Sequence, residues 1–316
     1  MTKLKVLIAD GLADDGIAIL QRVADVTSKP KITTEELIAE LPQYQALVVR
    51  SRTKVTKLVI DAGTSLKVIG RSGVGVDNID VDAATVKGIA VVNSPLAATV
   101  SVAELTMGLI IAMSREIPRG DSAMKNGEWL KSGLNGIELY SKTLGLVAVG
   151  RIGAAVAGRA GAFGMKVMAY DPFLSDEDIR RRQASPTTLD GLLAASDFIS
   201  IHSPLTPQTK GLIGASAFAK MKNGVRIVCA ARGGVVDEAA LLAALNSGKV
   251  AGAALDVFET EPPGKSPLVM HPKVIGTPHV GAQTAEAQRR AGIDIAEEVC
   301  AVLEGKEPRW RVTGKQ

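Results

Sequence analysis

The chain has 316 residues, of which 46% are hydrophobic and 3% are aromatic, so it has apolar material for two cores and is not a disordered chain. Its net charge of +4 comes from 37 basic and 33 acidic residues that are interspersed, which argues against nucleic acid as a partner. No apolar run of about 18 residues and no secretory leader is found, so no membrane span is expected. Cys229 and Cys300 lack metal-ligand spacing, so we expect no metal site and a cytoplasmic location.

Short Val/Ile/Leu runs alternate with segments of helical period in the first part of the chain. Helices between these runs begin near Asp or Thr, and Pro95 closes the series. A long helix over about 100–115 is apolar around much of its circumference. We interpret it as a connector and dimer contact, with an ordinary internal helix as the alternative. The predicted strands of this part are 5–10, 24–28, 46–50, 66–71 and 89–93.

A second series of apolar runs begins at 143–150 and continues through MKVMAYD, DFISIHSP, GVRIVCAAR, VAGAALDVF and VIGTPHV. These runs lack clean polar alternation, which is typical of central parallel strands with helices on both faces. A last helix over about 285–303 is expected to return to the first part. The pattern predicts an α/β fold with two doubly wound parallel-sheet domains and a cleft between them, one domain comprising 1–94 and 289–316 and the other 95–288.

The segment LGLVAVGRIGAAVAGRAGAFGMKVMAYDP has the layout of a dinucleotide-binding βαβ unit. Its turn reads Ala148-x-Gly150-x-x-Gly153, in which glycines let a pyrophosphate approach a helix N-terminus. Alanine replaces the first glycine, so either Ala148 has a negative φ or the affinity for the cofactor is reduced. Asp171 ends the second strand, where a carboxylate binds the adenosine ribose and repels a 2′-phosphate, which favours NAD over NADP. The basic run 180–182 is interpreted as a solvated helix face.

Three potential catalytic side chains interrupt apolar runs near the end of the chain: Arg232 in AARGGVVDE, Glu261 in ALDVFETEPP and His279 in IGTPHVG. An imidazole beside a carboxylate is a proton acceptor with a fixed tautomer, and a guanidinium grips a carboxylate with two hydrogen bonds. Of the other two histidines, His271 is interpreted as a surface residue and His202 as a loop cap or a cofactor contact.

These segments, together with RSRTKVT, GRSGVGVDNID, KTLGLVAVGRIG, HSPLT and TPHVGAQT, closely resemble the D-isomer-specific 2-hydroxyacid dehydrogenases over nearly the whole chain. The resemblance implies a Rossmann-type NAD domain, a flavodoxin-like substrate domain, and a cytosolic homodimer built through the cofactor domains. It implies catalytic roles for Arg232, Glu261 and His279, and oxidation of D-3-phosphoglycerate to 3-phosphohydroxypyruvate in serine biosynthesis. The implied NAD contacts are Gly150, Arg151, Ile152, Gly153, Asp171, Ser203, Ala230, Asp256, Gly281 and Ala282.

The substrate is expected to be a small D-2-hydroxy acid that carries a phosphate. Arg50, Arg52 and Lys54 alternate after a strand and would project to one side as a phosphate site, with a solvated turn as the alternative. Besides Arg232, the expected substrate contacts are Arg50, Ser51, Arg52, Val74 and Gly75, the last two in a Gly-rich turn that a carboxylate could approach closely.

Two other functions stay open. A hydroxypyruvate or glyoxylate reductase, or another D-2-hydroxyacid dehydrogenase, could use the same three residues. An NAD(H)-sensing corepressor-type binding protein is the alternative of another class, and the complete Arg, Glu and His set argues against it. The chain ends at Gln316, so the serine-binding regulatory domains of longer relatives are expected to be absent. Departures from the family pattern at Ala148, Ser141, Cys229 and 96–98 reduce the polar groups around the cofactor and the hinge, so they bear on NAD affinity and domain closure more than on the identity of the reaction.

Overall fold

Two sheets organise the chain in the computed structural model, which describes residues 3–314. One compact unit comprises Met1–Ala98 and Ala282–Gln316, and the other comprises Thr99–Gly281. The sequence placed the boundaries a few residues away, after 94 and after 288. The assignment of substrate and NAD to the two units remains a prediction.

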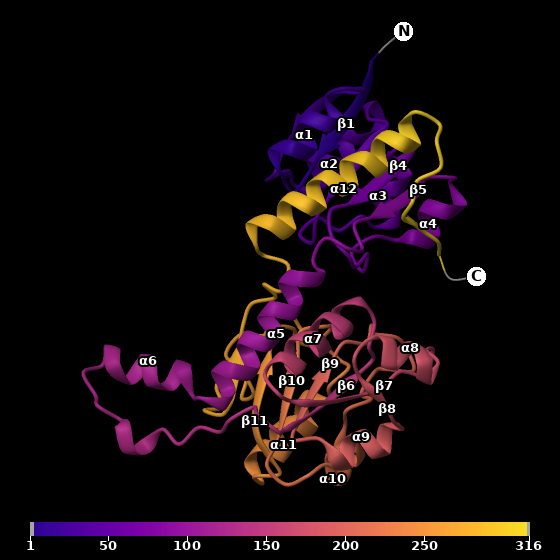
Figure 1. The fold of residues 1–316 in the computed structure, drawn as a ribbon. Helices are drawn as coiled ribbons and strands as arrows, with labels where there is room; N and C mark the ends of the chain where they lie inside the picture. The colour runs from indigo at the N-terminus through magenta and orange to yellow at the C-terminus, as the bar shows by residue number, and fades with distance from the viewer. Residues whose placement is uncertain (1–2, 315–316) are drawn as a thin grey trace. The chain divides into compact units, whose positions relative to one another are not determined.

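The first unit is a six-stranded sheet in the order β13-β5-β4-β3-β1-β2. All pairs are parallel except β13 with β5. Without β13 the order is the flavodoxin-like one, as predicted. The last helix, α12, lies against β4, β5 and α1, which makes this unit discontinuous (Figure 1). The strands are β1 (Leu4–Ile8), β2 (Ala24–Ser28), β3 (Ala46–Val49), β4 (Val68–Arg71), β5 (Ala90–Asn93) and β13 (Arg311–Val312), and the helices are α1 (Asp14–Leu20), α2 (Thr34–Glu40), the short η1 (Leu41–Gln43), α3 (Lys57–Ala62), α4 (Val81–Val86) and α12 (Ala285–Leu303).

The second unit is a seven-stranded sheet in the order β12-β11-β10-β9-β6-β7-β8, all parallel. Read from β8, this is the strand order of the Rossmann fold extended by one strand, so the predicted fold class is confirmed. The strands are β6 (Thr143–Val147), β7 (Lys166–Tyr170), β8 (Ser185–Pro186), β9 (Phe198–Ile201), β10 (Val225–Cys229), β11 (Val250–Leu255) and β12 (Val274–Gly276), and the helices are α5 (Thr99–Ser114), α6 (Ile117–Lys125), the short η2 (Lys131–Gly133), α7 (Arg151–Ala162), α8 (Asp176–Arg181), α9 (Leu189–Ala195), α10 (Ala215–Lys220) and α11 (Glu238–Asn246).

Each sheet is covered on both faces, because successive residues of a strand point to opposite sides. In β10, Ile227 and Cys229 pack into one apolar cluster and Val228 packs into the other. The first unit repeats the arrangement, with Leu47 on one face of β3 and Val48 on the other. The uninterrupted apolar runs of the sequence therefore follow from burial on both faces.

Two short strands were not predicted. β8 and β13 have two residues each, which is too short for a hydrophobic period to be visible in the sequence. The predicted long helix is α5, which packs against α7 and the sheet of its own unit. Within residues 3–314, no helix meets the length and apolarity needed to cross a membrane.

Candidate active site

The three candidate catalytic residues lie on turns that follow three neighbouring strands. Arg232 follows β10, Glu261 follows β11, and His279 follows β12. These strands are adjacent and parallel, so their carboxyl ends meet at one edge of the sheet. In an open α/β sheet this edge is where ligands bind. Residues separated by almost 50 positions in sequence are brought to one edge by strand order.

Glu261 and His279 form a direct pair. Glu261 Oε2 lies 2.8 Å from His279 Nδ1, and Glu261 Oε1 accepts the backbone N–H of Phe258 at 3.1 Å. The side chains are 38% and 48% exposed, so the pair is open to a ligand. A carboxylate on Nδ1 selects the tautomer that carries its proton there, which leaves Nε2 as a proton acceptor.

His279 sits on a turn that a buried carboxylate organises. Its φ of 53° is uncommon for a residue with a side chain. Asp256, 1% exposed, accepts hydrogen bonds from Thr277 Oγ1 at 2.6 Å and from the backbone N–H groups of Val280 and Gly281 at 2.8 Å each. These three donors hold both sides of the turn. The contact between Asp256 and NAD remains a prediction.

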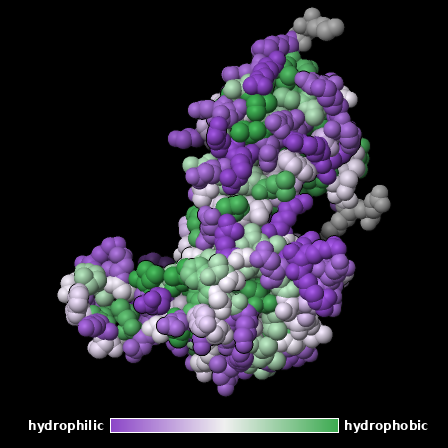
Figure 2. Space-filling model, viewed as in Figure 1, coloured by the Kyte–Doolittle hydropathy of each residue, from purple (hydrophilic) through white to green (hydrophobic). Residues whose placement is uncertain are grey.

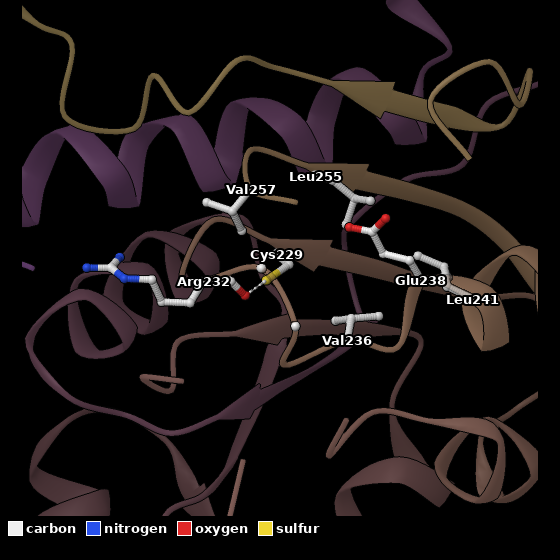
Figure 3. A pocket seen from close by; sticks show the side chains of 9 residues that line it. Cys229, Arg232, Val236, Glu238, Leu241, Leu255 and Val257 are labelled. Carbon is white, nitrogen blue, oxygen red and sulfur yellow. Dashed lines mark hydrogen bonds between the residues drawn. The ribbon is translucent and has the colours of Figure 1, made fainter. Parts of the chain in front are cut away.

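The Arg232 turn is packed tightly against the turn that leads to Glu261. A Cβ on Gly233 would lie 1.8 Å from the carbonyl oxygen of Phe258, so this position accepts only glycine. Behind the turn is a cavity of about 10 Å³, which is about the room that one water needs. Figure 3 shows Cys229 beside this cavity and the guanidinium of Arg232 directed away from it.

Cys229 is a buried strand thiol, as the sequence analysis predicted. Its Sγ lies 3.7 Å from the carbonyl oxygen of Arg232. Burial raises the pKa of this thiol to about 11, so it is protonated and unreactive at neutral pH.

The nucleotide turn between β6 and α7 contains the substituted glycine position. Ala148 has a φ of 66°, so the alternative that its φ is negative is wrong. A Cβ on Gly153 would lie 2.8 Å from the carbonyl oxygen of Ala148, so the turn lies directly on the helix. Asp171 directly follows β7 and binds this turn. Its Oδ2 accepts the N–H of Val149 at 3.0 Å, and its Oδ1 accepts that of Phe173 at 3.0 Å. Each carboxylate oxygen keeps a second lone pair for a ribose hydroxyl.

The residues around this turn fit NAD. α7 starts at Arg151, and its N-cap residue is Gly150, which has no side chain to cap the first turn. A Cβ on Gly150 would meet no atom within 4 Å, so the backbone there is open to a phosphate. The hydroxyl of Ser203 is buried and has no partner within the described residues, which is the condition of a group that awaits a ligand.

The other predicted cofactor contacts differ in exposure. Arg151 is exposed, and Ile152 is partly buried against the core of this unit. Ala230 and Gly281 are buried. Ala282 belongs to the first unit, where its carbonyl oxygen accepts a hydrogen bond from Gln288 at 2.7 Å.

His202 lies beneath the nucleotide turn and is not a proton carrier. Its Nε2 bonds Ser200 Oγ at 2.9 Å, and burial lowers the pKa of the imidazole from 6.5 to about 4. A Cβ on Gly153 would lie 3.7 Å from its Cδ2. The ring is therefore a neutral support for the start of α7.

The partly buried imidazole of His202 predicts a loss of stability in acid. Below about pH 6.5 the unfolded chain binds a proton that the folded chain does not, until the folded pKa of about 4 is reached. The free energy of unfolding is expected to fall by roughly 3 kcal/mol over this range because of this residue. Urea unfolding of wild type and His202→Asn at pH 7 and pH 4 measures it; the same pH dependence in both proteins would contradict the prediction.

The expected substrate residues of the first unit follow β3 and β4. Asp10, directly after β1, accepts the N–H of Arg50 at 2.7 Å and that of Thr53 at 3.1 Å. It also pairs with Arg52 Nη2 at 3.0 Å. Arg52 donates further to the carbonyl oxygens of Ala9 at 2.7 Å and Ile32 at 3.3 Å. The predicted row of cations therefore does not act as one phosphate site, because the guanidinium of Arg52 is bonded to groups of the protein itself.

Of the two arginines of this predicted site, Arg52 is the more exposed and Arg50 is partly buried. Within the described residues, Arg50 Nη2 donates to a neutral side-chain oxygen, Gln283 Oε1, at 3.4 Å. Ser51 and Val74 are exposed and Gly75 is partly exposed. The carbonyl oxygen of Val74 is held by Asn93 Nδ2 at 2.6 Å.

Two residues that hold the turns of these sites in place were not predicted from the sequence. Asp10 had a signal, since an acid ends the apolar run KVLIAD at the ligand-binding edge of a parallel sheet. Arg182, which bonds the carbonyl oxygen of Val149 at 2.7 Å, had none, because a basic run on a short helix gives no indication of its partner. Within residues 3–314, no group of three or more His, Cys, Asp or Glu side chains could hold a metal ion.

Comparisons with known proteins agree with this geometry. The model of the D-isomer specific 2-hydroxyacid dehydrogenase NAD-binding domain matches residues 107–281. A D-3-phosphoglycerate dehydrogenase of Methanocaldococcus jannaschii is 50% identical over 304 residues, which cover 96% of this chain and 58% of that protein. The chain thus spans less than two thirds of the length of this relative.

Two solved structures cover the chain almost completely. A glyoxylate reductase from Paecilomyes thermophila is 32% identical with a TM-score of 0.89, and covers 99% of both chains. A D-lactate dehydrogenase from Aquifex aeolicus, complexed with NAD and lactic acid, is 31% identical with a TM-score of 0.84, and covers 98% of this chain and 100% of its own. Both units of the chain therefore have counterparts in these structures.

Proposed function

The chain belongs to the D-isomer specific 2-hydroxyacid dehydrogenases, and we propose that it oxidises D-3-phosphoglycerate to 3-phosphohydroxypyruvate with NAD, the reaction that opens serine biosynthesis. The observation that carries the proposal is the hydrogen bond of 2.8 Å between Glu261 and His279, at the strand edge of a unit that matches the family's NAD-binding domain. The name of the relative with 50% identity supports the choice of substrate.

His279 is the proposed general base. Glu261 holds the proton on Nδ1, so Nε2 accepts the proton of the substrate's C2 hydroxyl. The imidazolium that forms is stabilised by the carboxylate already bonded to it. Asp256 keeps the ring in place through Thr277, Val280 and Gly281.

Arg232 is proposed to bind the substrate's carboxylate with both arms of its guanidinium, which orients C2 toward the base. NAD, when bound, accepts the hydride that leaves C2. Gly150 and the first turn of α7 would hold its pyrophosphate, and Asp171 its adenosine ribose. In the oxidation the proton of the C2 hydroxyl would go to His279 Nε2, and the hydride of C2 would go to the NAD held at this site.

Arg50 is the proposed phosphate contact of the first unit, since Arg52 is engaged with Asp10. A charge-assisted hydrogen bond is worth about 1.5–3 kcal/mol, so Arg50→Met should raise KM for D-3-phosphoglycerate by about 10- to 100-fold. The same variant should leave kcat/KM for D-glycerate within about twofold, because D-glycerate lacks the phosphate. Lys57→Met, which removes an exposed cation paired with Asp61 at 2.6 Å, is the matched control.

Steady-state NAD reduction with D-3-phosphoglycerate and with D-glycerate tests the substrate. A higher kcat/KM for D-glycerate, glyoxylate or hydroxypyruvate would replace the proposal by a reductase of unphosphorylated substrates, which the similarity to a glyoxylate reductase supports. NADH binding without turnover on any of these acids would instead favour a sensing protein.

We propose that the protein is a homodimer joined through the NAD-binding unit. α6 and the segment after it project from the body of this unit (Figure 1). Hydrophobic and hydrophilic residues lie side by side on the surface of this projection in Figure 2. Its exposed large apolar side chains are Ile117, 51% exposed, Met124, 57%, Trp129, 77%, and Tyr140, 71%. Apolar surface of this kind is typical of protein interfaces. Sedimentation equilibrium gives the mass, and a monomer at micromolar concentration would contradict the proposal.

A cytoplasmic location is part of the same proposal. Both cysteines are free thiols, which suits a reducing compartment. Cell fractionation with an antibody against the protein tests it, and recovery in a secreted or membrane fraction would contradict it.

A further inference from the structure

We propose that Arg182 is a positioning residue that holds Ala148 in a left-handed conformation, and that this pair sets the affinity for NAD. The inference rests on the NAD site of the proposed function. Arg182 lies in the basic run 180–182, and Ala148 stands where the family has a glycine. The observations that carry it are the backbone of Ala148 and the bonds around the next peptide.

Ala148 has a conformation that opposes its own side chain. Its φ is 66°, in the left-handed region that glycine enters freely and alanine enters at a cost. Such a conformation persists only where the surroundings impose it. The N–H of Ala148 is held by the carbonyl oxygen of Tyr170 at 2.8 Å, which secures one side of the residue.

The peptide after Ala148 is held at both of its polar groups. The N–H of Val149 donates to Asp171 Oδ2 at 3.0 Å, and its carbonyl oxygen accepts from Arg182 Nη1 at 2.7 Å. The second bond carries the charge of the guanidinium, so it is stronger than a neutral one. Together the two bonds fix the direction in which the chain leaves Ala148.

Arg182 differs from the two arginines beside it. Arg180 pairs with Asp176 at 3.4 Å, and Arg181 pairs with Asp178 at 3.4 Å and with Glu177. Both are exposed on α8, whereas Arg182 is partly buried after the end of that helix. The sequence interpretation of 180–182 as a solvated face therefore holds for Arg180 and Arg181 and is wrong for Arg182.

The conformation of Ala148 matters for the cofactor because α7 begins three residues later, at Arg151. The carbonyl oxygen of Ala148 lies close to Gly153, since a Cβ on residue 153 would be 2.8 Å from it. A change to negative φ would redirect Val149 and Gly150, and with them the N–H groups that bind a pyrophosphate. NAD binding would then have to restore the left-handed conformation and would be weakened by its cost.

Removal of the Arg182 side chain should therefore weaken NAD binding by an amount that depends on the residue at position 148. The cost of left-handed alanine converts to an affinity loss on the order of 5- to 30-fold for Arg182→Met. In the Ala148→Gly background the same change should cost less than about threefold, since glycine adopts positive φ without penalty. The Ala148→Gly change by itself should alter the affinity for NAD less than about threefold, because Arg182 already holds the turn.

Titration of the full chain with NADH, followed by cofactor fluorescence, measures this coupling without any substrate. The set is wild type, Arg182→Met, Ala148→Gly, the double variant, and Arg180→Met as the matched loss of a neighbouring charge with no effect expected. Arg182→Lys retains a donor and should bind NADH with intermediate affinity, which covers the case that Arg182→Met does not fold. Thermal melting without cofactor checks folding, and kcat at saturating NAD should stay within about twofold of wild type.

Equal losses for Arg182→Met in both backgrounds would overturn the inference, because they would mean that Arg182 contacts the cofactor itself. No loss in either background would overturn it as well. If wild type binds no NADH, the NAD site of the proposed function fails. If wild type binds NADH and only the coupling is missing, the proposed function stands without this inference.

Discussion

His279→Ala is expected to lower kcat for D-3-phosphoglycerate oxidation by at least about 10²- to 10⁴-fold, the usual contribution of a positioned general base. The imidazole is about half exposed, and its one strong partner is Glu261, so its removal leaves no void in a core. NADH affinity and the melting temperature should therefore stay close to those of wild type. Steady-state kinetics with saturating NAD, together with NADH titration, measure both effects.

His271→Ala is the matched control for the loss of an imidazole. This ring accepts the N–H of Lys273 at 3.1 Å on a polar loop, and its removal should not change kcat. Turnover near that of wild type in His279→Ala would refute the assignment of the base. A comparable loss in His271→Ala would mean that the effect comes from folding.

Glu261→Gln is expected to reduce kcat by on the order of 10²- to 10⁴-fold while the fold is kept, as when an amide replaces the carboxylate behind a catalytic histidine. Only the amide oxygen can accept the N–H of Phe258, which now bonds Glu261 Oε1 at 3.1 Å. The amide nitrogen must then face His279 Nδ1 and donate to it. Nε2 is left with the proton, so it cannot accept one from the substrate.

Glu259→Gln is the control that removes a neighbouring acid from the same loop. Its side chain accepts the N–H of Glu238 at 3.3 Å, and an amide oxygen can do the same. Activity is expected to stay within about threefold of wild type. If Glu261→Gln also stayed within about tenfold of wild type while His279→Ala lost activity, the carboxylate would not be the group that sets the tautomer.

The fold could be predicted from the sequence because its signals are local. Apolar runs without polar alternation indicate strands buried on both faces, and the helix over 285–303 appears in the structure with the expected bounds. The strand orders of both sheets agree with the predicted doubly wound class. The two strands that were not predicted, β8 and β13, are too short to show a hydrophobic period in the sequence.

The candidate site was predicted in its residue types and in part of its geometry. His279 and Glu261 are paired as expected, because each ends an apolar run and parallel strands bring such ends together. Arg52 was grouped with Arg50 on strand alternation, yet its guanidinium bonds Asp10, Ala9 and Ile32. The alternation of residues along a strand predicts the side to which a side chain points. It does not predict which hydrogen-bond acceptor from a distant part of the sequence that side chain will meet.

The sequence by itself determined the class of fold, the family, and the three side chains proposed for the chemistry, since periodicity, turn residues and motif spacing are all read along the chain. Only the tertiary structure decided that Ala148 has positive φ, that Asp256 holds the His279 turn, and that Arg182 bonds Val149. Such features depend on partners 24 or 33 positions away in sequence, whose meeting is set by strand order and packing. We therefore expect the residues packed around a substituted glycine turn to decide whether it still binds its cofactor.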